Sequence, residues 1–371
     1  MSFGLSHEIR GRLFEFLLLL VVCGSITFST AYINFQWFAR DLETATAPGD
    51  TAGYLSAYLA PEDILRGGSS LAFRDYRLAV PLLAHLVPEP PEAAFRSARR
   101  IDTLGLAVFK FAVVTALFNF AASVLTYAIC RWFQLPRLLS LLGSVLYSAL
   151  TFVAAVNGIP HVDSVFFFAF GLGAYALLTR SYGVLLLTAL VGTFVKEAIF
   201  LLGFLALLLP DEMRTRLRLI AVMIPGALVY VAVRYIILPG DRDYFASGTF
   251  VPLIGLAFHN LWTLNGLEWV FMGLDFLWLP LLWTLLRGGA DRVLVRWSLV
   301  IPVLIGVTIL GGSDHFARSL VLAYPTAIPL AMLGIQALLD RIESLQTESA
   351  PSTVQLERSS LRVASDELLH S

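Results

Sequence analysis

Charged residues are scarce in this sequence. Of its 371 residues, 14% are charged and 57% are hydrophobic. A soluble domain usually has about 25% charged residues, so the composition indicates a protein that lies largely in lipid. The formal net charge of -1 provides no basic face for a polyanion. Nucleic acid is therefore not an expected partner.

Lysine and cysteine are rarer still. Among the 26 basic residues only Lys110 and Lys196 are lysines. The two cysteines, Cys23 and Cys130, lie in apolar runs and do not have the spacing of a metal site. The sequence therefore predicts neither a disulfide framework nor a structural zinc site.

Long apolar runs are the main feature of the sequence. The length of each is close to the ~20 residues that a helix needs to cross a membrane. The first follows basic residues and no clear cleavage site follows it, so we interpret it as a retained signal anchor. The predicted fold class is therefore an all-α integral membrane protein with about eight spans. The runs are 13–33, 104–130, 138–156, 164–179, 217–238, 267–286, 297–311 and 319–339.

The runs divide the chain into one membrane domain and its flanking segments. We predict a cytoplasmic N-terminus over 1–12, a transmembrane domain over 13–339 and a disordered cytoplasmic tail over 340–371. The first external loop, 34–103, is the largest polar segment between spans. Its pattern predicts two amphipathic helices, near 50–60 and 76–87.

A further apolar stretch, 184–209, is interrupted by Lys196 and Glu197. If it crossed once, Arg180 before it and Arg216 after it would lie on opposite sides of the membrane. If it is a re-entrant hairpin, the arginine-rich loops all face the cytoplasm, as the positive-inside rule favours. Irregular backbone at membrane depth requires surrounding protein or a water-filled cavity. The hairpin interpretation therefore predicts a polar cavity at its tip.

Ionisable side chains gather near the predicted external ends of the spans. Each costs several kcal/mol in lipid unless it is paired or lines water, so each is a functional candidate. Their shared position predicts one outward-facing polar chamber, although an interfacial, snorkelling residue explains several of them equally well. The set includes Lys110, Asp163, Lys196, Glu197, Asp275, Asp314, His315 and Arg318.

A lipid phosphate in such a chamber needs cations to hold it and a carboxylate to accept a proton from an attacking hydroxyl. The carboxylates nearest the membrane in the first loop are Asp50 and Asp41; Asp50 is also explained as a helix cap. The adjacent pair Glu62 and Asp63 is a third choice for the base. The cations that suit the phosphate are Lys110, Lys196, His315 and Arg318.

Three short motifs occur in order along the chain. The first is Phe73-Arg74-Asp75-Tyr76-Arg77-Leu78-Ala79-Val80-Pro81-Leu82-Leu83, and the second is Lys196-Glu197. The third is Asp314-His315-Phe316-Ala317-Arg318-Ser319-Leu320, followed by Tyr324-Pro325 and Ile328-Pro329. They resemble, in the same order, the "yR-x-L-x-P-L-L" segment, the "K-E" motif and the last-span signature of bacterial GT-C glycosyltransferases. The similarity covers about residues 34 to 335.

The resemblance implies a GT-C-like helical bundle in the bacterial inner membrane, with its active site facing the periplasm. The donor would be a polyprenyl-phosphate sugar and the acceptor a glycan, lipid or protein. It also implies an inverting mechanism with Asp50, or else Asp41, as base. Lys196 and Arg318 would bind the phosphate, with Glu197 orienting Lys196.

The family often has two adjacent acids where Asp50 stands alone, so the base and any requirement for a divalent cation stay open. Arg74 and Arg77 would reach the same chamber from the loop. Two other classes of protein fit the same features. One is a transporter or flippase for a polyprenyl-linked saccharide, which needs polar residues along the whole path. The other is a polymerase or ligase of lipid-linked glycans.

Overall fold

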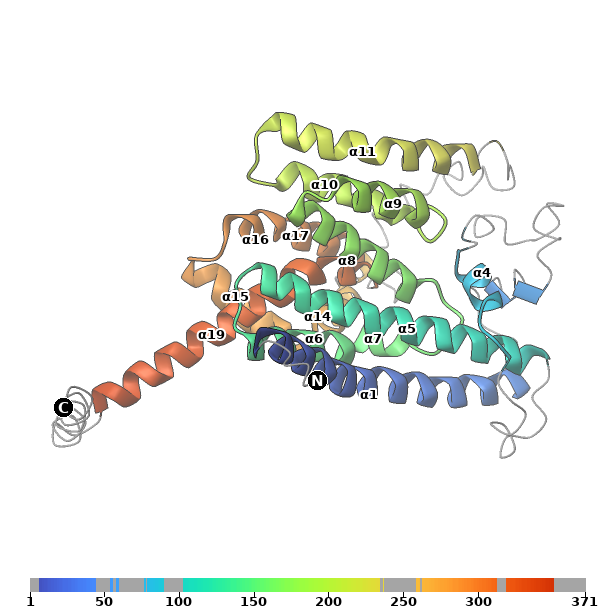
Figure 1. Cartoon of the computed structure of the whole chain (residues 1–371), viewed down its shortest axis with the longest axis horizontal. Coiled ribbons are helices and arrows are strands. Elements are labelled where there is room, and N and C mark those ends of the chain that lie inside the picture. Colours follow the sequence, from blue (N-terminus) through green and yellow to red (C-terminus); the bar gives the residue numbers. More distant parts are fainter. Residues whose placement is uncertain are drawn as a thin grey trace, which may run out of the picture.

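The computed structural model describes residues 7–44, 54–55, 58–59, 77, 79–89, 103–233, 236, 258–260, 262–311 and 318–349. Within these ranges the regular structure is helical, and no strand is present among them. Most of the helices pack side by side along one common direction, and the last helix runs obliquely away from them (Figure 1).

Six helical stretches in the described ranges are long and apolar enough to cross a membrane, by length and composition. They indicate a multi-pass membrane protein. Two of them are broken, at η5 (Asp275–Leu277) and between α16 and α17. In chain order they are α1 (His7–Thr44), α5 (Thr103–Trp132), α11 (Met213–Ala232), α14 with η5 and α15 (Asn265–Leu274, Trp278–Arg287), α16 with α17 (Arg292–Trp297, Val300–Gly311), and η6 with α19 (Arg318–Ala323, Tyr324–Ser349).

The other two predicted spans are shorter helices. Residues 138–156 form α6 (Arg137–Ala149) and α7 (Thr151–Val156), which are separated at Leu150 by an extended residue. Residues 164–179 lie in α8 (Asp163–Thr179). Each is apolar, but none has the length of the six long stretches.

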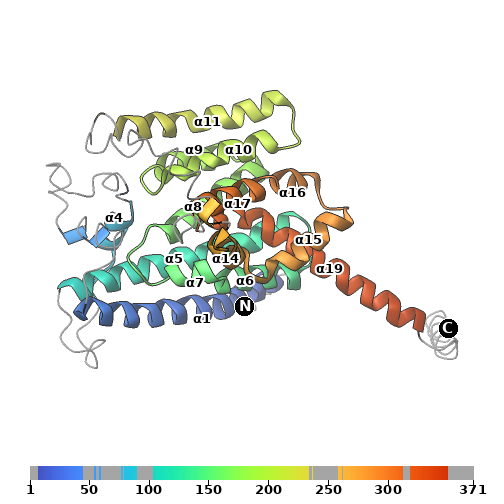
Figure 2. The same cartoon turned by 180° about the vertical axis from the view of Figure 1, so that it is seen from behind.

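The 184–209 stretch reverses direction. It consists of α9 (Tyr182–Gly192), an extended turn, η3 (Glu197–Phe200) and α10 (Leu201–Leu208). Arg180, which ends α8, forms a salt bridge with Asp211, which precedes α11. The segment therefore leaves one end of the bundle and returns to the same end, which is the path of a hairpin. Figures 1 and 2 show α9 and α10 between α8 and α11.

Three helix boundaries differ from those predicted from the sequence. Helix α1 continues past residue 33 to Thr44, so it includes the start of the predicted first loop. Helix α19 continues to Ser349, so residues 340–349 are helical where a disordered tail was predicted. These residues are mostly good helix formers that extend an existing helix, which avoids the cost of nucleation. In the first loop, α4 (Ala79–His85) occupies part of the predicted 76–87 helix.

The connection between α7 and α8 is fixed to α1 and α5. Asn157 donates from Nδ2 to the Thr27 carbonyl oxygen at 2.7 Å, and the Gly158 amide donates to Thr115 Oγ1 at 2.9 Å. Gly158 has φ +85°, and a Cβ at this position would lie 2.3 Å from the Ala31 carbonyl oxygen. Only glycine satisfies both conditions. This connection fixes the start of α8.

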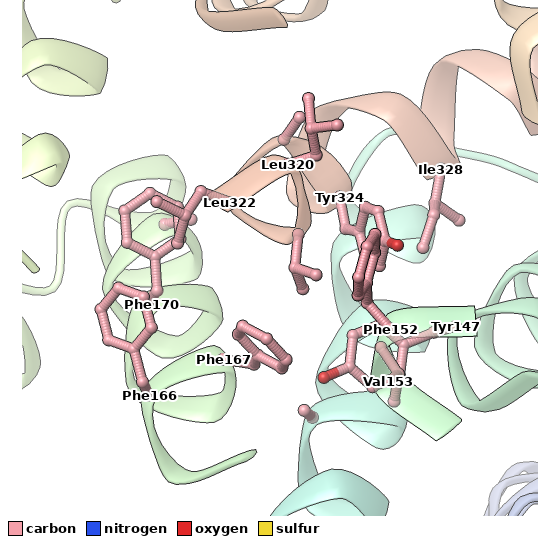
Figure 3. Packing of buried hydrophobic residues seen from close by; sticks show 14 of the residues in the cluster. Tyr147, Phe152, Val153, Phe166, Phe167, Phe170, Leu320, Leu322, Tyr324 and Ile328 are labelled. Carbon is pink, nitrogen blue, oxygen red and sulfur yellow. The ribbon is translucent and has the colours of Figure 1, made fainter. Parts of the chain in front are cut away.

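The apolar core joins α8 to the start of the last helical stretch. Phe166, Phe167 and Phe170 of α8 are buried, and Figure 3 shows Phe170 beside Leu322 of η6, with Phe167 pointing toward the side of Phe152 and Tyr147. On the other side Tyr147 packs edge-on against Tyr324, with ring centroids 6.1 Å apart. The ends of α8 and η6 are thus held together by buried aromatic and aliphatic side chains.

Candidate functional site

The Asp163 carboxylate lies at the centre of the candidate site. Its side chain has no exposed surface, and it is the first residue of α8. Lys196 Nζ lies 3.0 Å from Oδ1, and Arg318 Nη1 lies 2.9 Å from Oδ2. A buried carboxylate is stable only when paired, and here two cations from distant parts of the chain pair with it.

His161 completes the same cluster. Its Nε2 lies 2.5 Å from Arg318 Nη1, and its Nδ1 lies 3.2 Å from Asp163 Oδ2. The Asp163 amide donates to Nδ1 at 3.2 Å. His161 thus lies between the Arg318 guanidinium and the start of α8.

Lys196 reaches the cluster because the hairpin breaks at its tip. Lys196 has extended backbone, with φ -164° and ψ 136°, between α9 and η3. Gly192 allows the returning chain to approach, since a Cβ there would lie 2.6 Å from Ile199 Cγ1. The ammonium also lies 5.3 Å from the centroid of the Phe166 ring. These contacts direct the side chain toward the start of α8.

Arg318 reaches the cluster from another element, as the first residue of η6. Its side chain is only 9% exposed. Because η6 packs against α8, as described above, the position of Arg318 relative to Asp163 is fixed. The two cations thus belong to two separate elements that meet at one carboxylate.

The loop between α1 and α5 is attached to the hairpin tip. Arg77 Nη2 donates to both carboxylate oxygens of Glu197, at 2.9 and 3.0 Å, and the Ala79 amide donates to the Phe194 carbonyl at 3.2 Å. Arg77 Nη1 lies 3.4 Å from the hydroxyl of Tyr54, whose ring packs edge-on against His161. The loop therefore contacts the hairpin tip through Arg77 and Ala79, and the charge cluster through Tyr54.

The role expected for Glu197 differs from its observed contact. Among the described residues Glu197 is paired with Arg77, and Lys196 is paired with Asp163. Two adjacent residues in an extended and then turning backbone direct their side chains to different neighbours. Glu197 therefore anchors the loop, while Lys196 belongs to the buried cluster.

Asp275 lies outside this cluster. Its Oδ2 accepts from the Thr151 amide at 2.8 Å, and its Oδ1 accepts from the Thr151 hydroxyl at 2.9 Å. Thr151 is the first residue of α7, so Asp275 caps that helix from the broken α14–α15 stretch. Its own backbone has φ +46° and ψ -133°, which lies outside the left-handed helical region and is a conformation that glycine adopts most readily. Its role in the structure is that of a helix cap.

Lys110 is buried in α5 with 7% exposure, and none of the described side chains forms a hydrogen bond or ion pair with it. A buried lysine is expected to have an anionic partner.

Several predicted site residues lie outside the described residues: Asp50, Glu62, Asp63, Arg74, Asp314 and His315. Asp41 lies in α1, but its side chain is not among those described. In the part of the chain that the structure describes, no three His, Cys, Asp or Glu side chains are grouped as metal ligands.

No protein-family model matches this sequence, and no curated protein matches it either. The chemistry of the site therefore rests on its own geometry. Lys196 and Arg318 are two cations that converge on the buried carboxylate of Asp163, inside an apolar bundle where little water screens their charge.

His161 and Tyr54 were not predicted from the sequence. The signal for His161 was present: Asn157-Gly158-Ile159-Pro160-His161-Val162-Asp163 is a polar interruption between two apolar runs. His161 lies two residues before the acid that was singled out. Tyr54 gave no comparable signal, because a tyrosine in a polar loop is an ordinary feature.

Proposed function

We propose that this protein is a membrane glycosyltransferase of the bacterial inner membrane, which transfers a sugar from a polyprenyl-phosphate carrier to a periplasmic glycan, lipid or protein. The observation that carries the proposal is the convergence of Lys196 and Arg318 on Asp163. A lipid-borne phosphate is an anion that reaches such a site from within the bilayer. The two cations are the groups that would hold it.

The attachment of the first loop supports a catalytic site at this position. Tyr54 contacts His161, and Asp50 precedes Tyr54 by four residues. Four residues span at most about 14 Å, so the proposed base is tethered near the cluster. The reaction needs a carboxylate base and an anion site close together, and the loop and the hairpin tip would supply them.

The proposed mechanism is a single displacement. Asp50, or else Asp41, accepts the proton of the acceptor hydroxyl, and the oxygen attacks the anomeric carbon. The bond between this carbon and the phosphate oxygen breaks, and its electron pair leaves with the polyprenyl phosphate. The configuration at the anomeric carbon inverts. Lys196 and Arg318 would stabilise the charge that develops on the leaving phosphate.

The proposed orientation follows from the arginines. Arg137 pairs with Glu15 near the start of α1, and Arg180 pairs with Asp211, whereas α4 lies at the other end of the bundle (Figures 1 and 2). Arg296 donates to the Leu209 carbonyl, beside the same turn as Asp211. Because basic residues favour the cytoplasmic side, the end with α4 and the first loop would face the periplasm.

The test is to incubate the purified protein with polyprenyl-phosphate sugars and to measure release of the bare carrier. Lys196→Ala and Arg318→Ala should each reduce donor affinity by about tenfold or more, because each removes one charge-assisted contact. Arg292→Ala is the control, since Arg292 is exposed at the start of α16. Unchanged donor affinity in both site variants would contradict the proposal.

A further inference from the structure

A basic cavity lies beside the crossing of α15 and α19. Thr284 Oγ1 donates to the Leu330 carbonyl oxygen at 2.8 Å, and a Cβ on Gly334 would lie 2.3 Å from the Pro280 carbonyl oxygen. The two helices are therefore in close contact at this level. Helix α19 then runs obliquely out of the bundle beside α15 (Figures 1 and 2). Four side chains line a cavity of about 490 Å³ between them: Trp283, Leu286, Arg287 and Arg341.

Two arginines from different helices give the cavity its charge. Arg287 is the last residue of α15 and Arg341 lies on α19, and both are exposed. Arg287 Nη1 donates to the Ala337 carbonyl oxygen at 3.2 Å. A guanidinium has five N–H donors, so this bond leaves donors for a ligand. None of the described acidic residues forms a salt bridge with either arginine, and this includes Asp340, which lines an adjoining cavity.

An apolar stripe on α15 leads from the arginines toward the middle of the helical stretch. Its members, Leu279, Leu282, Trp283 and Leu286, are all exposed, and Leu279 and Leu286 are 78% and 84% exposed. Their spacing of three and four residues places them along one side of the helix. In a stretch that is long and apolar enough to cross a membrane, such side chains lie against acyl chains. Trp283, one turn before Arg287, has the position of an interfacial tryptophan.

We propose that this cavity binds one anionic phospholipid of the cytoplasmic leaflet, with its phosphate between Arg287 and Arg341 and an acyl chain along the stripe. Basic cavities between spanning helices on the cytoplasmic side suit anionic headgroups. The cavity lies at the arginine-rich end of the bundle, because Arg296, after the turn that follows α15, donates to the Leu209 carbonyl. The inference does not rest on the proposed glycosyltransferase activity. It needs only a protein that spans a membrane in the orientation given above.

Native mass spectrometry of the full-length protein in detergent tests the proposal. The protein is titrated with dioleoyl phosphatidylglycerol, which is anionic, and with dioleoyl phosphatidylcholine, which has the same chains and phosphate but no net charge. Because two arginines face the phosphate, we expect the first phosphatidylglycerol to bind about tenfold or more tightly than phosphatidylcholine. Equal affinity for the two lipids would overturn the proposal. This comparison uses the native protein and needs no variant.

Arg287→Gln and Arg341→Gln test whether the lipid binds in this cavity. Glutamine keeps a polar side chain but removes the charge, so each variant should bind phosphatidylglycerol about fivefold more weakly and phosphatidylcholine within about twofold of the native protein. The matched control is Arg292→Gln, because Arg292 is exposed at the same end but does not line the cavity. If the control loses as much affinity as the two cavity variants, the lipid responds to the overall charge of this end and the proposed site is wrong.

A ligand without acyl chains tests the stripe. Glycerophosphoglycerol has the headgroup of phosphatidylglycerol and the same charge, but it cannot cover the apolar side chains of α15. Because burial of each methylene group is favourable, we expect it to bind about 100-fold or more weakly than the lipid. If it binds as tightly as the lipid, the cavity takes a soluble phosphate diester and not a phospholipid. If neither cavity variant weakens phosphatidylglycerol, the lipid binds elsewhere, and the proposal is again wrong.

Discussion

Arg180 and Asp211 form a salt bridge, although the 30 positions between them hold a hydrophobic stretch long enough to cross a membrane. Because both residues lie at the same end of the bundle, the stretch between them must turn back. The turn contains Lys196, which is thereby brought to the start of α8. The Arg180–Asp211 contact closes the hairpin, and the hairpin brings Lys196 into the interior.

Labelling of engineered cysteines tests the hairpin. Arg214→Cys, which follows the hairpin, and Tyr182→Cys, at its start, are both exposed positions. We expect both to react with an impermeant thiol reagent from the cytoplasmic side alone. The native Cys23 and Cys130 are buried and provide the background. Labelling of the two positions from opposite sides would show that the stretch crosses once.

The burial of Asp163 predicts a large effect of Asp163→Asn on stability. The substitution leaves Lys196 and Arg318 in the interior without their carboxylate. Removing one partner of a buried ion pair costs about 3 to 5 kcal/mol of unfolding free energy. Denaturant unfolding in detergent measures it. Asp211→Asn is the control, because its pair with Arg180 is partly exposed and should contribute about 1 kcal/mol or less. Equal losses for the two variants would refute this account of the cluster.

Substitution of Gly158 should also lower stability, because it would disturb the backbone of the α7–α8 connection. Gly158→Ala places a Cβ against the Ala31 carbonyl and forces an unfavourable φ, so we expect a loss of about 2 kcal/mol or more of unfolding free energy. Gly183 in α9 has open space around it, and Gly183→Ala should be neutral or slightly stabilising. Thermal unfolding of both variants gives the comparison. A Gly158→Ala protein as stable as the native one would mean that the α7–α8 connection is not fixed as described.

Substitution of Asp275 should lower the stability of the protein without changing its affinity for ligand. Asp275→Ala removes the cap of α7 and should cost about 1 to 2 kcal/mol of unfolding free energy. Its effect on affinity for the polyprenyl-phosphate donor should be less than about twofold, because its contacts lie with Thr151 and not in the cluster. Asp275→Asn keeps one acceptor oxygen and should lose less stability. A large fall in affinity without a loss of stability would place Asp275 in the binding site.

The Arg77–Glu197 pair predicts coupling between the loop and the hairpin. Arg77→Ala and Glu197→Gln should each reduce sugar transfer, and the double variant should lose less than the sum of the two. Because Glu197 is 39% exposed, we expect a coupling energy of about 1 kcal/mol in a double-mutant cycle. Additive losses would mean that the two residues act independently.

The long apolar runs could be predicted from the sequence because lipid imposes a length and a composition on every spanning helix. The six long helical stretches fall within or across the predicted runs. The ends of the helices could be predicted less accurately than the positions of the apolar runs. Helix α19 continues past residue 339 because exposed polar residues extend a helix as readily as they form a coil, and composition alone does not distinguish the two.

The sequence also singled out Lys196, Arg318 and Asp163, since charges in apolar runs are rare. It did not show that they share one carboxylate. That contact depends on tertiary packing, in which the hairpin tip and η6 approach α8 from two sides. It also assigned Asp275 to the polar chamber, whereas the structure uses Asp275 to cap α7. The same carboxylate chemistry serves binding and helix capping, and only the neighbouring groups distinguish them.

The most direct test is a structure of the protein with a bound polyprenyl phosphate, determined by cryo-electron microscopy in a lipid nanodisc. We predict that the phosphate lies within hydrogen-bonding distance of Lys196 Nζ and the Arg318 guanidinium. A phosphate bound away from both residues, with Lys196 and Arg318 still paired to Asp163, would contradict the proposed function.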